Sequence, residues 1–205
     1  MQNTEQTTQE KILCAAKAEF LEKGFQTASL RTIVKAAGVT TGALYGYYGS
    51  KEALFDALVE ECYTHFLSSY RNALDDFDRL PIEQQPERMS SVSQACLEEL
   101  LLYMFNHREA FHLLLLCSEG THYSSMKEEL VQLEVNAAHR YYLVLEKLGT
   151  SAPQIDPRLE HILVTGLMNA YFEMIIHDMP LADAQQYLRE LHSFYSAGWL
   201  KIMGQ

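Results

Sequence analysis

The sequence predicts an all-α protein in which three short N-terminal helices precede a larger helical body. Apolar residues recur at the three- and four-residue spacings of amphipathic helices, and no stretch of useful length alternates as a β-strand would. Glycine or proline stands at most of the expected helix ends. We therefore expect one domain over residues 1–50 and a second, larger helical domain over residues 51–205.

Composition excludes several classes of protein. The chain has 205 residues, of which 48% are hydrophobic and 21% charged, so collagen-like and mainly disordered chains are excluded. No apolar run approaches the ~18 residues of a membrane span, and MQNTEQTTQEK at the start lacks the pattern of a signal peptide. Four scattered cysteines without a CxxC pair argue against a zinc site. We expect a cytoplasmic protein with no membrane, metal or cofactor.

Charge is distributed unevenly along the chain. The formal net charge is −11, which ordinarily counts against a nucleic-acid partner because phosphate affinity comes mainly from Lys and Arg. Residues 23–51, however, contain four basic residues and no Asp or Glu, whereas the chain from residue 61 onward carries ten basic and twenty acidic residues. This asymmetry indicates two separate tasks, or else a solvated surface that lacks acids by chance.

The N-terminal segment contains the start and stop signals of short helices. Thr7 and Glu10 form a capping box for the first, which we expect to end at Gly24. Ser29 is the expected cap of the second helix, and Gly38 supplies the positive φ that ends it. Thr40 then caps a third helix over residues 41–47, so only three residues separate the second and third. A connection of this length containing glycine predicts a helix-turn-helix.

The third helix leaves several hydroxyl-bearing side chains on its outer surface. The expected packing turns Leu44 and Tyr48 inward, so that Thr41, Tyr45 and Tyr47 are available for other contacts. Hydroxyl groups and backbone N–H groups at helix starts hydrogen-bond phosphate oxygens, and Lys51 adds a charge where the next helix begins after Ser50. The alternative is that these tyrosines are ordinary core or surface aromatics.

Residues 11–60 resemble the DNA-binding domain of the TetR/AcrR family of transcriptional regulators. The resemblance is carried by Lys23-Gly24-Phe25, Ala36-Ala37-Gly38-Val39, Gly42-Ala43-Leu44-Tyr45 and Ser50-Lys51-Glu52-Ala53-Leu54-Phe55. The usual Tyr-x-His-Phe is here Tyr45-Gly46-Tyr47-Tyr48, which transfers the role of the His to Tyr47. By position, the resemblance implies that the following residues face double-stranded DNA: Ser29, Arg31, Thr40, Thr41, Gly42, Tyr45, Tyr47 and Lys51.

The resemblance also sets expectations for the rest of the chain. It implies a repressor that binds a palindromic operator as a homodimer, with an unknown small-molecule effector bound in the second domain. We expect the body helices near residues 51–80, 87–106, 108–118, 124–148, 157–178 and 181–203. In the family the last two helices form a four-helix bundle with those of a second subunit.

The penultimate helix is nearly apolar all round, and its polar residues form one stripe that includes Asn169 and Glu173. This stripe is either a solvated edge or the polar wall of an interior cavity facing Asn136 and Arg140. A buried Glu would need Arg140 or a cationic effector as its partner. The apolar lining of such a cavity, if these residues are not simply core, would come from Tyr103, Met104, Phe111, Met168, Tyr171 and Phe172.

Two hypotheses from other classes stay open at this point. The Glu109-x-x-His112 and Glu119-x-x-His122 sequences suggest a helical-bundle metalloenzyme, but the motifs are too close in sequence to converge easily. The second hypothesis is a DNA-binding protein that organises the chromosome instead of controlling genes. No hydrolase or phosphate-loop motif is present, so we expect a regulator and not an enzyme.

Overall fold

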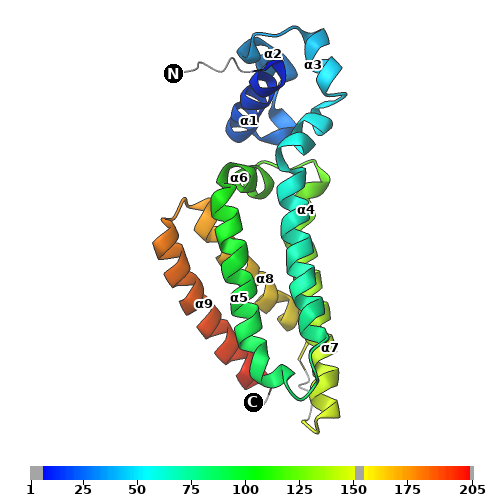
Figure 1. Ribbon diagram of the computed structural model, residues 1–205, viewed down its shortest axis with the longest axis vertical. Coiled ribbons are helices and arrows are strands. Elements are labelled where there is room, and N and C mark those ends of the chain that lie inside the picture. Colours follow the sequence, from blue (N-terminus) through cyan, green and yellow to red (C-terminus); the bar gives the residue numbers. More distant parts are fainter. Residues whose placement is uncertain (1–6, 151–154, 204–205) are drawn as a thin grey trace. The chain divides into compact units, whose positions relative to one another are not determined.

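The computed structural model describes residues 7–150 and 155–203, and throughout these ranges the regular secondary structure is helical (Figure 1). The all-α prediction is confirmed. The helices are α1 (Thr8–Thr27), α2 (Leu30–Ala37), α3 (Thr41–Tyr47), α4 (Lys51–Asp78), α5 (Gln85–Asn106), α6 (Arg108–Leu116), the 3₁₀ helix η1 (His122–Ser125), α7 (Met126–Lys147), α8 (Pro157–Ile176) and α9 (Leu181–Ile202).

The chain forms two compact units. The first comprises α1–α3, the start of α4 up to Thr64, and the segment Arg108–Ser124 with α6 and most of η1. The second comprises the remainder of α4 from His65, together with α5, α7, α8 and α9. The boundary predicted at residue 50 separates functions, whereas these two units are groups of residues that pack together. Helix α4 contributes residues to both units.

A cluster of aromatic rings forms the centre of the first unit. Phe20 packs edge-on against Phe55 with ring centroids 5.1 Å apart, and Phe25 contacts Phe55 at 5.3 Å. The backbone N–H of Phe25 donates to the carbonyl oxygen of Cys117 at 2.8 Å, which joins the end of α1 to the segment after α6. These contacts explain why the beginning of α4 packs with the N-terminal helices.

The helix ends of the first unit follow most of the sequence signals. The Thr7–Glu10 capping box is present, Gly38 ends α2 at φ 66°, and the Thr40 hydroxyl accepts a hydrogen bond from the Ala43 N–H. Gly24 (φ 71°, ψ 165°) interrupts the helix, but one further turn follows it and α1 closes only at Thr27. Ser29 begins α2 without a side-chain capping bond, so that expected cap is not formed.

The second unit is a bundle of helices around an apolar core. Phe66 lies against Phe172 with centroids 5.9 Å apart, and the buried Tyr171 hydroxyl donates to the Leu97 carbonyl oxygen at 2.8 Å. A Cβ atom on Gly166 of α8 would lie 2.8 Å from the Tyr195 hydroxyl of α9. The missing side chain at Gly166 is thus what lets α9 pack closely against α8.

The body helices match their expected ranges closely, with differences near residue 120. α6 ends at Leu116, two residues early, and the Ser118 hydroxyl donates to the Leu114 carbonyl at 2.6 Å. Residues expected to open α7 instead form η1. None of the described helices is long and apolar enough to cross a membrane.

Candidate functional site

The exposed surface of α2 and α3 is the candidate nucleic-acid interface. In α3, Leu44 is fully buried, whereas Tyr45 and Tyr47 are each 51% exposed; Tyr48, which follows the helix, is 7% exposed. Thr41 and Gly42 lie exposed in the first turn of the same helix. The helix therefore buries one face in its own unit and presents two phenol groups and a threonine hydroxyl on the other, as expected from the sequence.

The start of α2 adds charge and a constrained backbone to this surface. Arg31 is exposed, as is Lys35 one turn later. The N–H of Ser29 donates to Glu19 Oε1 at 3.0 Å, and the Glu19 side chain is nearly buried. This hydrogen bond fixes the turn that carries Ser29 and Arg31, whereas the Ser29 hydroxyl makes no capping bond to α2.

Lys51 has a structural role that the sequence did not reveal. Its Nζ donates to the carbonyl oxygens of Gln26 at 3.1 Å and Ala28 at 3.3 Å, and lies 4.7 Å from the centre of the Phe25 ring. The ammonium group thus stabilises the end of α1 through charge-assisted hydrogen bonds and a cation–π contact. A lysine has three N–H donors, so one remains for a phosphate oxygen.

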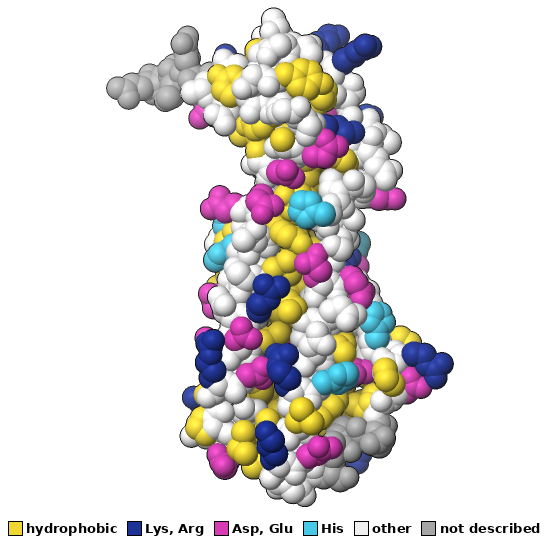
Figure 2. All heavy atoms as spheres, turned by 90° about the vertical axis from the view of Figure 1, so that its right-hand side faces the viewer, with side chains coloured by type: hydrophobic (Ala, Val, Ile, Leu, Met, Phe, Trp, Pro, Cys, Tyr) yellow, Lys and Arg dark blue, Asp and Glu magenta, His cyan; other side chains and the backbone are white. Residues whose placement is uncertain are grey.

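Figure 2 shows the charges of the second unit on one face of the molecule. Lys and Arg side chains are interspersed with Asp and Glu, and hydrophobic side chains are exposed between them. The excess of acidic residues therefore does not gather into a single negative patch on this face.

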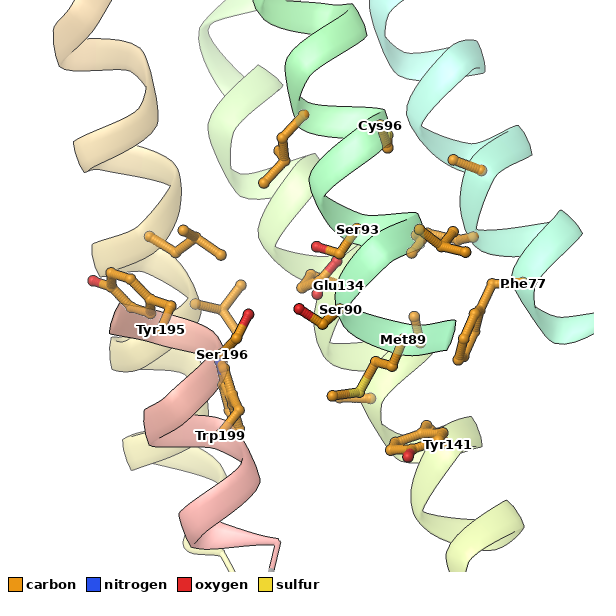
Figure 3. Close-up of a pocket in the computed structure, with 18 of the residues that line it drawn as sticks. Phe77, Met89, Ser90, Ser93, Cys96, Glu134, Tyr141, Tyr195, Ser196 and Trp199 are labelled. Carbon is orange, nitrogen blue, oxygen red and sulfur yellow. The ribbon is translucent and has the colours of Figure 1, made fainter. Parts of the chain in front are cut away.

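The second unit contains a cavity of about 140 Å³ between five helices (Figure 3). Its lining is mainly aromatic and aliphatic, with few polar groups, as is typical of small-molecule sites. The residues come from α4 (Tyr70, Ala73, Leu74, Phe77), α5 (Met89, Ser90, Val92, Ser93, Cys96, Leu97), α7 (Glu134, Ala137, Ala138, Tyr141, Tyr142), α8 (Val164, Leu167) and α9 (His192, Tyr195, Ser196, Trp199, Met203).

Burial controls the ionisation of the polar groups along this cavity. It raises the pKa of the Glu134 carboxyl, against the lowering effects of the Tyr70 hydrogen bond and of Arg140. Burial, reinforced by Glu134 and Glu99, raises the pKa of the Cys96 thiol to about 12, so this cysteine is an unreactive thiol at neutral pH. Burial lowers the pKa of His192, which favours its neutral form.

The nine residues proposed from the sequence to bind a ligand do not line this cavity. Met104, Phe111, Met168 and Phe172 are buried in cores, and Phe111 belongs to the first unit. Tyr103 stacks between His65 and His107. Asn136, Arg140, Asn169 and Glu173 are exposed. Asn169 and Glu173 of the polar stripe of α8 are thus solvated, and Glu173 pairs with His177 at 2.7 Å.

Glu134, the acidic residue of the cavity lining, was not among the ligand-binding residues expected from the sequence. Glu134 is a lone carboxylate between Leu133 and Val135, and the small residues Ala137 and Ala138 follow one turn later. Because small side chains leave space beside a helix, this combination is consistent with one wall of a cavity, but it does not indicate the other four helices that enclose it.

The metalloenzyme hypothesis gains no support from the geometry. Glu109 forms an ion pair with Lys17 of α1. Within residues 7–150 and 155–203, no three His, Cys, Asp or Glu side chains are grouped so that they could hold a metal ion.

Comparison with known proteins identifies the class to which this fold and interface belong. Residues 12–58 match the family model described as bacterial regulatory proteins, tetR family. The transcriptional regulator UidR of Escherichia coli (strain K12) is 36% identical over 75 residues, which are 37% of this chain and 38% of UidR. The regulator YvdT of Bacillus subtilis (strain 168) is 31% identical over 143 residues, 70% of this chain and 66% of YvdT.

A solved structure extends the comparison over most of the chain. NalD, described as the secondary repressor of the MexAB-OprM multidrug efflux pump in Pseudomonas aeruginosa, is 25% identical, with a TM-score of 0.52 over 90% of this chain and 93% of NalD. The fold is therefore that of a helix-turn-helix regulator. The chain belongs to the TetR/AcrR family of transcriptional regulators, which is not a family of enzymes. The match to UidR covers about two fifths of the length of UidR.

Proposed function

We propose that the protein is a ligand-responsive transcriptional repressor that binds a palindromic operator in the cytoplasm as a homodimer. The observation that carries this proposal is the outer face of α3, where Tyr45 and Tyr47 are half exposed while Leu44 of the same helix is buried. In this proposal the phenol and threonine hydroxyls bind phosphate groups together with the exposed Arg31 and Lys35, and Thr41 contacts a base edge. The description of NalD as a repressor supports repression, as opposed to activation, of transcription.

Exposed apolar residues on the last two helices support the homodimer. Ile162 of α8 is 63% exposed, and on α9 Tyr187 and Phe194 are 55% and 74% exposed. Tyr187 and Phe194 are seven residues apart, so they share one face of α9. Large apolar side chains on one face are the usual sign of a protein interface, and a second copy of the chain would cover them.

Selection of operator DNA tests the proposal directly. Purified protein is mixed with fragments of the source genome, and the bound fragments are sequenced and footprinted. We expect a small number of sites, each an inverted repeat whose half-sites are about 34 Å apart along the duplex. Thr41→Ala should change base preference at one position in each half-site by ~1–3 kcal/mol.

The same experiment separates the alternatives. Many dispersed sites without an associated promoter would favour the chromosome-organising protein, and binding with no sequence preference would contradict the regulator. Lys147→Ala, on the exposed surface of α7, is the matched control and should leave the selected sequences unchanged.

A further inference from the structure

The cavity of the second unit has a marked imbalance of charge. Among the described residues that line it, Glu134 is the acidic one, and none is a Lys or an Arg. His192, the basic residue of the lining, is kept neutral by burial, which lowers its pKa. Any occupant therefore meets a carboxyl group and aromatic faces, and no cationic side chain that would bind an anion.

The carboxyl group of Glu134 has hydrogen-bonding capacity left for an occupant. The Tyr70 hydroxyl donates to Glu134 Oε2 at 2.5 Å, while Oε1 receives no donor from the residues that the structure describes. Glu134 is partly buried, and a carboxylate withdrawn from water is costly unless it is paired, so an occupant that brings positive charge or N–H donors gains more here than in water.

The guanidinium group of Arg140, whose charge acts on Glu134, does not fill this role. Arg140, on the same helix, pairs through its Nε with Asp78 Oδ2 at 2.5 Å and lies outside the lining. It acts on Glu134 only through its charge, and its effect is smaller than that of burial. The cavity thus keeps an acidic group that its own protein neighbours do not neutralise.

The remaining wall suits the apolar part of a cation. Figure 3 shows Glu134 beside Ser90 and Ser93, with Met89, Phe77, Trp199 and Tyr141 at one end of the cavity. Aromatic faces attract cations in addition to burying apolar surface. A cavity of about 140 Å³ accepts a molecule of roughly one aromatic ring with a small substituent.

We propose that the effector is a small lipophilic organic cation, an aryl-alkyl ammonium compound whose charged nitrogen lies at Glu134 and whose ring lies among Phe77, Tyr141 and Trp199. This inference rests on the proposed function, because only a ligand-responsive regulator has an effector. It names the chemical class that the cavity selects.

Calorimetric titration with two matched probes tests the inference. Benzyltrimethylammonium carries a permanent charge, and neopentylbenzene has the same shape with carbon in place of the charged nitrogen. We expect the cation to bind the full-length protein at least tenfold more tightly than its neutral isostere. In Glu134→Gln this preference should fall to less than threefold, because the amide retains an acceptor for Tyr70 but not the charge.

Two further variants make the result specific. Glu146→Gln makes the same change on the exposed surface of α7 and should leave both affinities unchanged. Glu134→Asp retains the charge and should keep a preference for the cation, which guards against a folding defect in the glutamine variant. Each variant is compared with the wild type by circular dichroism before titration.

Every other outcome overturns the inference. Equal affinity for both probes would show that charge is not selected, and cation binding unaffected by Glu134→Gln would place the ligand elsewhere. If neither probe binds while the protein still selects operator DNA, the regulator function stands and the proposed ligand class fails. Loss of operator selection is measured separately, without any probe.

Discussion

Lys51 illustrates how a single side chain can serve the fold and a binding surface together. Its ammonium group holds the end of α1 through Gln26 and Ala28, so removing it disturbs the position of the neighbouring α2 as well as any phosphate contact. Arg31 is exposed in α2, where its charge is available to DNA. Replacement of each residue by alanine is therefore expected to have different effects on protein stability and on DNA binding.

Salt dependence of DNA binding separates these two roles. Arg31→Ala should reduce the slope of log K against log salt by about one unit per subunit, with the free energy of unfolding unchanged within ~0.5 kcal/mol. Lys51→Ala should lower the stability of the protein by ~1–3 kcal/mol in addition to weakening binding. A Lys51→Ala protein with wild-type stability would contradict the structural role.

Glu134 gives a pH dependence with a defined sign. Burial raises its pKa in the folded protein above the ordinary 4.5, so between these two values the folded state holds a proton that the unfolded state has lost. The contribution of Glu134 to stability is therefore greatest below pH 4.5 and falls by up to about 1.4 kcal/mol per pH unit as the pH rises through this window. Tyr70, Cys96, Arg140 and Tyr142 are titratable or charged groups that interact with this carboxyl.

Urea unfolding of the wild type and Glu134→Gln at several pH values measures this contribution. The difference between the two proteins should shift in favour of the variant as the pH rises, because the glutamine has no proton to lose. Parallel pH profiles for the two proteins would show that Glu134 ionises as it does in the unfolded chain.

Among the helices, α1 depends on a glycine at an unusual backbone conformation. Gly24 has φ 71° and ψ 165°, a region that is almost restricted to glycine. Gly24→Ala should therefore destabilise the protein by ~1–3 kcal/mol, measured by thermal or urea unfolding.

Gly46 provides the matched control within α3. It lies in a helix, and a Cβ atom there would meet nothing within 4 Å among the described residues. Gly46→Ala should stabilise the protein by ~0.5–1 kcal/mol, because alanine loses less conformational freedom than glycine in a helix. Equal losses at both positions would mean that the Gly24 conformation carries no special strain for alanine.

The helices were largely predictable because their ends depend on local chemistry. The Thr7 capping box, the Gly38 turn and the Thr40 cap involve residues within a few positions of one another, and all three were confirmed. The cavity was not predictable in the same way, because its wall combines residues from five helices. Ser29 shows the limit even for caps, since its N–H is bound by the distant Glu19 instead.

At the scale of the whole molecule, the expected homodimer makes a direct prediction. Phe194→Asp places a charge on the most exposed of the large apolar side chains of α9 and should convert the dimer into monomers, as measured by analytical ultracentrifugation. Leu143→Asp is the control, because Leu143 is 57% exposed on α7. A dimer that survives Phe194→Asp would place the subunit contact on another surface.

Helix α9 has two surfaces with different partners in this scheme. His192, Tyr195 and Trp199 line the cavity, while Tyr187 and Phe194 are exposed on the outside. A rigid helix cannot shift one surface without shifting the other, so a molecule that displaces α9 from within alters how tightly two subunits associate. By thermodynamic reciprocity, association then alters the affinity for that molecule by the same factor, and the sensitivity of the protein to its effector would depend on its own concentration.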